Sequence, residues 1–480
     1  MLILSKNKKM SKLVRMDYKL VVENFIIENF QKKKVLILGF GREGKSTFNL
    51  IRRFLPQKKL FVADKNEKLQ ETSSFHPTDK NIHFILGEKY LDNLFDFDII
   101  IKTPGISLNH EKLDVSNFKI TSQSDLFLQM FSDQIIGVSG TKGKSTCSSL
   151  IAHIIKQFTN NVLLVGNIGL PSFEIIPKIN KKTKIVFELS SHQLEFVKRS
   201  PHIAILLNFF QEHLDHYNNY DDYKNAKFNI AKFQNIYDYF IYNSDDKQIE
   251  DILKEKHLKQ NIIRYSNNNR PETNCYISDN NIVFSSSGET TNLIDLNYKR
   301  FLIGDHNISN ILAAVCACKI AGIHDKAIRK GIASFKSLEH RLEYVGEYGN
   351  IRFYNDSIAT IPEATIEAVK TLKDVDTLIL GGYDRGVNYE GLVDFIKNTG
   401  ILNLIFLGDK NNRLFTEMQK SIRDKSFFTV NGFSEASEII KKHTKPKSIC
   451  LLSPAAASYN LFSNFEERGN EFKKMAKKLI

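Results

Sequence analysis

The chain has 480 residues, 42% of them hydrophobic, which is long enough for about three domains and too apolar for a disordered protein. No apolar run approaches the roughly 20 residues needed to span a bilayer, and the five cysteines are odd in number and form no Cys-x-x-Cys pair, so we expect a cytoplasmic protein without a disulfide framework or a zinc site. The net charge of +13 is spread along the chain, which favours a lysine-rich solvated surface over nucleic-acid binding.

Residues 1–126 are predicted to form the first of three α/β segments, with 1–33 as a helical extension. The first predicted strand is the Val-Leu-Ile-Leu run that follows Lys34, and two further strands cover Leu60–Ala63 and Asp98–Lys102. The predicted helix runs from Ser46 to Phe54. This alternation of strands and helices is typical of a parallel sheet.

The turn after the first strand carries the first of two Gly-Lys-Ser-Thr tetrapeptides. It reads Gly39-Phe40-Gly41-Arg42-Glu43-Gly44-Lys45-Ser46, which satisfies both the P-loop pattern and the G-x-G-x-x-G pattern of dinucleotide-binding folds. Gly41 occupies the position where a backbone approaches a diphosphate at a helix N-terminus, and Asp64 ends the next strand. Taken alone, this segment predicts a diphosphate-nucleotide site, and an NAD-dependent oxidoreductase is one interpretation of it.

Residues 127–337 are predicted to form a central parallel sheet with a small antiparallel insert. Its predicted strands begin at Gln134 and cover Asn161–Val165, Lys184–Leu189, Ile203–Asn208 and Asp238–Tyr242. Asp279-Asn280-Asn281 predicts a hairpin tip. A helix that places Ile308, Ile311 and Val315 on one face should end at Gly322.

The second Gly-Lys-Ser-Thr lies in the turn Gly137-Val138-Ser139-Gly140-Thr141-Lys142-Gly143-Lys144-Ser145-Thr146. This turn fails the strict P-loop pattern, because Val138 replaces the first glycine. It still has the necessary chemistry: two glycines that free backbone amides, the Lys144 ammonium for phosphates, and two hydroxyls for Mg²⁺. The chemistry of a phosphate-binding loop therefore survives although the pattern fails.

Residues 338–480 form the third predicted α/β segment. Its predicted strands lie around Arg352–Asn355, Thr377–Leu380, Leu404–Leu407 and Ile449–Leu452.

Gly-Thr-x-Gly-Lys-Ser at the start of a middle α/β domain resembles the ATP loop of the Mur ligase family. Other segments match the family in order: Gly166-Asn167-Ile168-Gly169-Leu170-Pro171, Glu188-Leu189-Ser190-Ser191, Asn208, Glu212-His213-Leu214-Asp215-His216-Tyr217, Asp305-His306-Asn307, His340-Arg341-Leu342-Glu343, and the ending from Leu452 to Phe472. The resemblance covers nearly the whole chain from about Lys34. It implies a Rossmann-like UDP-binding domain, a central P-loop ATPase-like domain and a C-terminal Rossmann-like domain that binds an amino acid.

The resemblance also implies an activity, the ATP-dependent addition of D-glutamate to UDP-N-acetylmuramoyl-L-alanine through an acyl phosphate during peptidoglycan precursor synthesis. Two positions depart from the pattern common among D-glutamate-adding relatives, since Ile358 and Arg385 stand where many or several of them carry lysine. An L-glutamate-adding relative and a folylpolyglutamate-type ligase are the alternatives within amide ligation. We expect small-molecule substrates and a monomer.

The resemblance assigns roles to four sets of residues. The catalytic set is Lys144, Glu188, His213 and Lys227, and two Mg²⁺ ions would be held by Ser145, Glu188, His213 and Lys227, with the lysine as a carbamate. ATP would be bound by Gly140, Thr141, Lys142, Gly143, Lys144, Ser145, Thr146, Asn307, Asn310, Arg341 and Asp356. The UDP substrate would be bound by Gly41, Arg42, Glu43, Gly44, Asp64, Thr103, Pro104, Gly105 and Asn167, and glutamate by Thr360, Arg385, Ser458 and Phe465. Taken as single residues, Lys227 has the alternative of a surface lysine, and His213 that of a zinc ligand or a solvated side chain. For Asp305 the plainer role is a helix N-cap.

Overall fold

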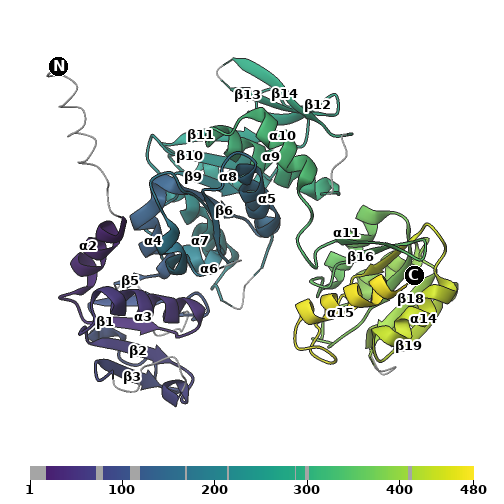
Figure 1. The fold of residues 1–480 in the computed structure, drawn as a ribbon, viewed down its shortest axis with the longest axis horizontal. Coiled ribbons are helices and arrows are strands. Elements are labelled where there is room, and N and C mark those ends of the chain that lie inside the picture. The colour runs from purple at the N-terminus through teal and green to yellow at the C-terminus, as the bar shows by residue number, and fades with distance from the viewer. Residues whose placement is uncertain are drawn as a thin grey trace, which may run out of the picture. The chain divides into compact units, whose positions relative to one another are not determined.

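A computed structural model describes residues 18–71, 79–108, 119–167, 170–212, 216–286, 288–297, 302–408 and 413–479. Three β-sheets organise the chain, and most of their strands run parallel, as the sequence predicts (Figure 1). Contacts divide the chain into two compact units, Met1–Lys299 with Ser309–Ala333, and Arg300–Ile308 with Ser334–Ile480. The domain boundaries at residues 126 and 337 stay predictions.

The first unit begins with a parallel five-stranded sheet in the order β3-β2-β1-β4-β5. All four residues of β1 are apolar and buried, as expected for a central strand with both faces covered. Helix α3 begins at Arg42, four residues before its predicted start, because Gly41 is its N-cap. The elements are α2 (Tyr18–Phe30), β1 (Val35–Leu38), α3 (Arg42–Phe54), β2 (Leu60–Asp64), β3 (Ile82–Leu86), β4 (Ile99–Lys102), β5 (Ile120–Thr121) and α4 (Gln123–Phe131).

The second sheet of this unit has nine strands in the order β14-β13-β12-β11-β10-β9-β6-β8-β7. The predicted antiparallel insert is confirmed, since β12, β13 and β14 pair antiparallel and extend the sheet at one edge. Asp279 and Asn280 have φ values of 46° and 61° at the predicted hairpin tip. The strands are β6 (Ile135–Ser139), β7 (Val162–Gly166), β8 (Lys184–Glu188), β9 (Ile203–Leu206), β10 (Tyr239–Asn243), β11 (Asn261–Tyr265), β12 (Cys275–Ser278), β13 (Asn281–Ser286) and β14 (Glu289–Asp295). The helices are α5 (Lys144–Lys156), α6 (Ser191–Leu194), α7 (Tyr220–Lys232), α8 (Lys247–Lys254), α9 (Asp305–Ile320) and α10 (Asp325–Ser334).

A single hydrophobic cluster joins the first two sheets. It runs from Val35 and Ile51, beside the first sheet, through Phe127 of α4 to Ile185 and Phe187 of the second. Because this core is continuous, the first glycine turn and the segment after β8 belong to one packed body.

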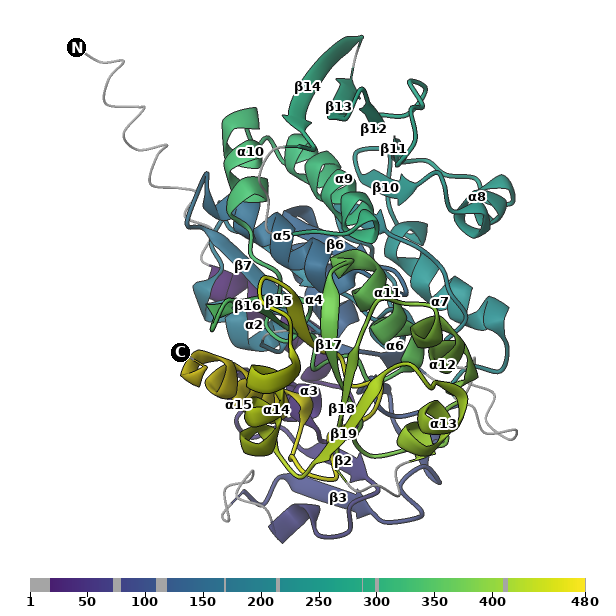
Figure 2. The same cartoon turned by 90° about the vertical axis from the view of Figure 1, so that its right-hand side faces the viewer.

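The second unit is built on a six-stranded sheet in the order β15-β16-β20-β17-β18-β19, in which only β15 pairs antiparallel. Helices cover both faces of this sheet (Figure 2), and each face has its own hydrophobic cluster. The strands are β15 (Glu343–Tyr348), β16 (Ile351–Asn355), β17 (Val375–Leu380), β18 (Asn403–Leu407), β19 (Ser426–Val430) and β20 (Ile449–Leu452). The helices are α11 (Pro362–Leu372), α12 (Glu390–Lys397), α13 (Arg413–Ser421), α14 (Phe433–His443) and α15 (Phe465–Lys478).

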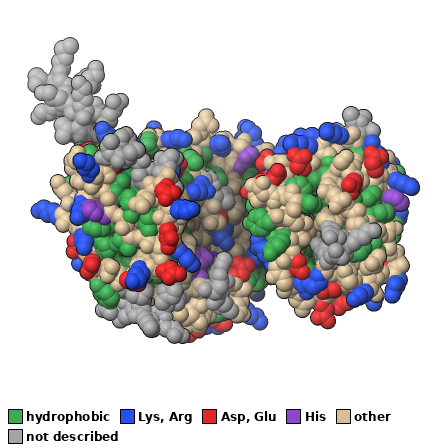
Figure 3. Space-filling view, turned by 90° about the horizontal axis from the view of Figure 1, so that it is seen from below, with side chains coloured by type: hydrophobic (Ala, Val, Ile, Leu, Met, Phe, Trp, Pro, Cys, Tyr) green, Lys and Arg blue, Asp and Glu red, His purple; other side chains and the backbone are tan. Residues whose placement is uncertain are grey.

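Basic and acidic side chains are interspersed on the face shown in Figure 3, and the five cysteines are buried and free. Within the described ranges, no helix combines the length and the apolar character that a membrane crossing requires.

Candidate active site

The second glycine turn connects β6 to α5 and has the geometry of an anion-binding loop. Gly140 and Gly143 adopt φ values of 149° and 86°, which side chains disfavour. A Cβ on Gly143 would lie 2.4 Å from Asn310 Oδ1, so α9 packs directly against the turn. Helix α5 begins at Lys144 with Gly143 as its N-cap, and its N-terminal backbone amides favour a phosphate.

Two lysine side chains converge on the carbonyl oxygen of Gly140. Lys144 Nζ donates to it at 2.9 Å and to Thr141 O at 2.8 Å, while Lys227 Nζ donates to it at 2.8 Å from helix α7. Lys227 is only 2% exposed, and burial, followed by the charge of Lys144, holds its pKa well below the ordinary range. The structure therefore brings together two of the predicted catalytic residues and leaves Lys227 easily deprotonated.

Glu188 lies at the end of β8 and is fully buried. Its carboxylate accepts hydrogen bonds from Asn167 Nδ2 at 2.9 Å and from the hydroxyls of Ser145 at 3.2 Å and Ser148 at 3.4 Å. The amide of Asn167, which the sequence assigned to the UDP substrate, thus contacts the carboxylate beside the second turn. A buried carboxylate next to a hydroxyl offers hard oxygen donors, the kind that Mg²⁺ prefers.

Asn208 and Tyr223, which are not among the predicted site residues, both hold the second turn. Asn208 Oδ1 accepts from the backbone N–H groups of Thr141 at 3.1 Å and Lys142 at 2.8 Å, and Tyr223 OH lies 2.8 Å from Thr141 Oγ1. Lys142 also pairs with Glu212. Asn208 is the last residue of a predicted strand, a position that could have identified it.

The first glycine turn is built differently. Side chains on Gly39 or Gly44 would collide with their surroundings, since a Cβ on Gly39 would lie 2.1 Å from Thr103 Oγ1 and one on Gly44 would lie 2.1 Å from Gly39 O. A Cβ on Gly41 would meet no atom within 4 Å, so the backbone of this residue faces open space. Asp64 Oδ2 accepts from Phe40 N at 2.7 Å, which ties the end of β2 to the turn.

Glu43 connects this turn to the second sheet. Its carboxylate accepts from Gln193 Nε2 of α6 at 2.7 Å, and its Oε2 has no hydrogen-bond partner among the described residues. Burial raises the pKa of Glu43, and the hydrogen bond from Gln193 and the charges of Lys102 and Arg42 offset part of this effect. Lys102, which is also not among the predicted site residues, is buried and forms an ion pair with Glu195 at 3.1 Å.

The remaining predicted residues fall in the second unit or beyond the described ranges. Arg341 lies between His340 and Leu342, whose φ values are 64° and 43°, and Asp356 accepts from Leu342 N at 3.1 Å. Burial raises the pKa of Asp356 to about 7, although its hydrogen bonds and Arg341 act against this shift. The Arg385 guanidinium lies over the Tyr459 ring at 5.6 Å, and Ser458 is buried.

Asn307 donates to Ile303 O at 2.6 Å, and its part in nucleotide binding, like that of Arg341 and Asp356, stays a prediction. His213 lies outside the described residues.

Known proteins resemble both the sequence and the fold. Residues 138–318 match the model of the Mur ligase middle domain. The UDP-N-acetylmuramoylalanine–D-glutamate ligase of Oenococcus oeni is 34% identical over 456 residues, which cover 94% of this chain and 98% of the relative. The enzyme of the same name from Acetivibrio thermocellus is 32% identical and covers 93% of this chain and 97% of the relative.

This chain belongs to the Mur ligase family. Mur ligases are ATP-dependent amide ligases, so the family excludes the oxidoreductase that the first glycine turn left open. Solved structures share the fold at lower identity. The MurF ligase of Thermotoga maritima in complex with ADP has a TM-score of 0.56 at 15% identity and covers 94% of this chain and 96% of its own. The UDP-N-acetylmuramate–alanine ligase MurC of the same organism has a TM-score of 0.54 at 16% identity and covers 93% and 99%.

Proposed function

We propose that this Mur ligase joins D-glutamate to the L-alanine carboxylate of UDP-N-acetylmuramoyl-L-alanine with hydrolysis of ATP to ADP and phosphate. The observation that carries the proposal is the second glycine turn, where Lys144 and Lys227 share the Gly140 carbonyl beside the buried Glu188. Relatives over nearly the full length that bear the D-glutamate ligase name support the choice of substrates.

A carboxylate is a poor electrophile, so amide formation requires its activation. In the proposed reaction the alanine carboxylate oxygen attacks the γ-phosphorus of ATP, the bond to the β-phosphate oxygen breaks, and an acyl phosphate and ADP result. The neutral amine of glutamate then attacks the acyl carbon, and phosphate leaves as the amine gives up a proton. Negative charge builds on the phosphoryl oxygens in the first step, where the Lys144 ammonium and the amides at the start of α5 stabilise it.

The residues present fit a magnesium ion. Glu188 and Ser145 supply a carboxylate and a hydroxyl oxygen in contact with one another at 3.2 Å, and such a small oxygen set suits an ion that takes its other ligands from phosphates and water. Among the described residues no three His, Cys, Asp or Glu side chains form a metal cluster, so phosphate ligands are part of the proposal. Magnesium supplies Lewis-acid stabilisation of the phosphates when it is bound.

Lys227 is proposed to react with carbon dioxide. Burial and Lys144 favour its neutral amine, which is the form that adds to carbon dioxide and becomes a carbamate. The carbamate would add oxygen donors for a second magnesium ion, together with His213. Intact-mass measurement of the native protein at neutral pH in bicarbonate should show an adduct of the mass of carbon dioxide that Lys227→Met lacks; an unmodified native protein in bicarbonate would contradict this part.

The first glycine turn is proposed to bind the UDP end of the substrate. The open space at Gly41 and the exposure of Arg42 at the N-terminus of α3 support an approach of the diphosphate to this backbone. Thr103, Pro104 and Gly105 follow the adjacent strand β4 at the same edge of the sheet.

One assay tests the proposal. Phosphate release should require ATP, magnesium, UDP-N-acetylmuramoyl-L-alanine and D-glutamate together, and Lys144→Ala should abolish it. Faster turnover with L-glutamate would instead assign this chain the L-glutamate-adding reaction, the alternative that Ile358 and Arg385 leave open. Release with a folate in place of the muramoyl substrate would assign the folylpolyglutamate reaction, and no release with either glutamate isomer would refute the proposal.

A further inference from the structure

Arg468 in the first turns of α15 is a buried cation without an anionic partner. The side chain is 1% exposed, and no carboxylate in the described part of the chain forms an ion pair with it. Burial alone lowers the pKa of Arg468, to about 10, so the guanidinium remains charged at neutral pH. A buried charge is costly unless hydrogen bonds and a counter-charge compensate it.

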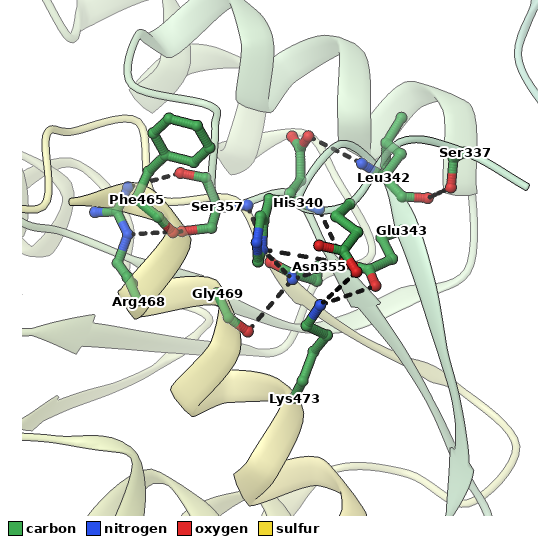
Figure 4. Close-up of polar contacts among 12 residues, drawn as sticks. Ser337, His340, Leu342, Glu343, Asn355, Ser357, Phe465, Arg468, Gly469 and Lys473 are labelled. Atoms are coloured by element: carbon green, nitrogen blue, oxygen red, sulfur yellow. Dashed lines mark hydrogen bonds and ion pairs between the residues drawn. The ribbon is translucent and has the colours of Figure 1, made fainter. Parts of the chain in front are cut away.

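The guanidinium instead donates to uncharged acceptors on two loops. Nε donates to Ser357 Oγ at 3.0 Å and one terminal nitrogen donates to Ser357 O at 2.8 Å (Figure 4). The other terminal nitrogen donates to Ala456 O at 3.1 Å. The Ser357 hydroxyl in turn donates to Phe465 O at 2.8 Å. Arg468 thereby joins the loops that follow β16 and β20.

A third loop passes directly over the guanidinium. A Cβ on Gly382, which follows β17, would lie 3.1 Å from a terminal nitrogen of Arg468 and 2.1 Å from Ala457 O. Tyr383 N also donates to Ala457 O at 2.8 Å. Because β16, β20 and β17 are adjacent and parallel, Arg468 lies beneath the loops at their shared carboxyl edge.

These loops, together with the first residue of α15, carry all four residues that the resemblance assigns to glutamate. Thr360 follows β16, Arg385 follows β17, and Ser458 and Phe465 follow β20. Ligands of open α/β sheets bind at the carboxyl ends of the strands. The uncompensated charge of Arg468 therefore lies behind the loops where an anionic amino acid is expected.

Helix α15 makes close contacts next to Arg468. A Cβ on the adjacent Gly469 would lie 2.1 Å from His340 Nδ1, and Asn355 Nδ2 lies 2.9 Å from the same nitrogen. One turn later, Lys473 Nζ pairs with Glu343 at 3.2 Å (Figure 4). With the helix packed on this side, the guanidinium lies beneath the three loops.

We propose that Arg468 is a positioning residue for the incoming amino acid, which orients the Ser357 and Ala456 loops and whose uncompensated charge favours a dicarboxylate. The inference rests on the proposed ligase function. It assigns Arg468 no contact with the substrate, and its effect is expected in glutamate binding rather than in ATP binding.

The test compares Arg468→Met, Arg468→Lys and a matched control, Lys474→Met, which removes an exposed lysine of the same helix. Michaelis constants are measured for glutamate, ATP and the muramoyl substrate, together with inhibition by glutarate, a dicarboxylate without an amine. Arg468→Met should raise the KM for glutamate and the inhibition constant of glutarate about tenfold, which corresponds to about 1.4 kcal/mol, and leave the other two KM values within about twofold. Arg468→Lys should recover part of the loss because it keeps the charge, and Lys474→Met should change nothing.

Equal rises in all three KM values, or an unchanged KM for glutamate in Arg468→Met, would overturn the proposal. Thermal unfolding identifies a variant that fails to fold. In that case Ser357→Ala, which removes one acceptor of the guanidinium, should raise the KM for glutamate about threefold, or about 0.65 kcal/mol, and an unchanged value would overturn the proposal. Absence of turnover in the unsubstituted chain would instead refute the proposed function.

Discussion

The two glycine turns of the first unit share the tetrapeptide Gly-Lys-Ser-Thr but place it at different positions of the following helix. In the first turn the helix begins at Arg42, so Lys45 is its fourth residue and donates its N–H to Gly41 O at 3.0 Å. In the second turn the helix begins at Lys144 itself, and the first such bond runs from Cys147 N to Gly143 O at 2.9 Å. The same four residues are therefore helical in one turn and straddle the N-cap in the other.

This shift decides what each lysine does. Lys45 extends to solvent from the helix surface, whereas Lys144 folds back over its own turn to the carbonyls of Gly140 and Thr141. The first turn matches the strict P-loop pattern and the second does not. Helix position, rather than agreement with a pattern, thus determines which ammonium folds back over its own turn.

Replacing each of the two lysines in turn with alanine gives the largest expected difference in kcat. Lys144→Ala should lower kcat for phosphate release at least about a thousandfold, because the charge on the phosphoryl oxygens loses its stabilising cation. Lys45→Ala should leave kcat within about twofold and act, if at all, on the KM for the muramoyl substrate. Steady-state kinetics check both variants, and the reverse result would mean that the roles of the two turns are exchanged.

The carboxylates beside the two turns provide the next contrast. Glu188→Gln should lower kcat/KM on the order of a hundredfold and raise the magnesium concentration needed for half-maximal rate, since the amide is a weaker ligand than a carboxylate. Glu43→Gln is the matched change beside the first turn and should not alter the magnesium dependence. A magnesium titration of both variants measures this, and equal shifts would contradict the assignment of the ion to the second turn.

Replacing one glycine of each turn with alanine should separate the effect of backbone strain on stability from the effect of a side chain on ligand binding. Gly143→Ala forces an alanine into a φ of 86° against Asn310 and should cost about 1–3 kcal/mol of unfolding free energy, with about tenfold weaker ATP binding. Gly41→Ala has an allowed φ of −68° and open space, so stability should change by less than about 0.5 kcal/mol. Its effect should appear in the KM for the muramoyl substrate. Calorimetry and nucleotide titration check the pair, and similar destabilisation of both would refute it.

Much of the fold follows from the sequence, because the strands that carry it are apolar runs with clear ends. β1, β6 and β20 are fully buried and were predicted within a residue or two. β3 and β19 were not predicted, since neither has a fully buried pattern: β3 is half-buried throughout and β19 is buried only at Val430. Partly covered edge strands lack the continuous apolar run that identifies a central strand.

The site was predictable where residues adjacent in sequence remain adjacent in space. The turn from Gly140 to Ser145 is such a case. Contacts such as Gln193 with Glu43, 150 positions apart, and Arg468 with Ser357, 111 positions apart, depend on how strands are ordered in a sheet. No spacing or pattern within one segment encodes them, so they require the structure.

The smallest expected effect is a pH dependence of stability at the first turn. Burial raises the pKa of Glu43 above its unfolded value of about 4.3. Above that pH the unfolded chain gives up the proton before the folded one does, so the free energy of unfolding falls as pH rises until the folded pKa is passed. Glu43→Gln removes this dependence, and its stability relative to the unsubstituted chain should therefore rise between about pH 4 and neutrality, by at most about 1.4 kcal/mol per pH unit. Glu174→Gln, at an exposed carboxylate, serves as the control in thermal unfolding across this range. If the curves of stability against pH for Glu43→Gln and the unsubstituted chain run parallel, the pKa of Glu43 is not raised by folding and the prediction is wrong. The hydrogen bond from Gln193 would then offset the whole effect of burial on this pKa.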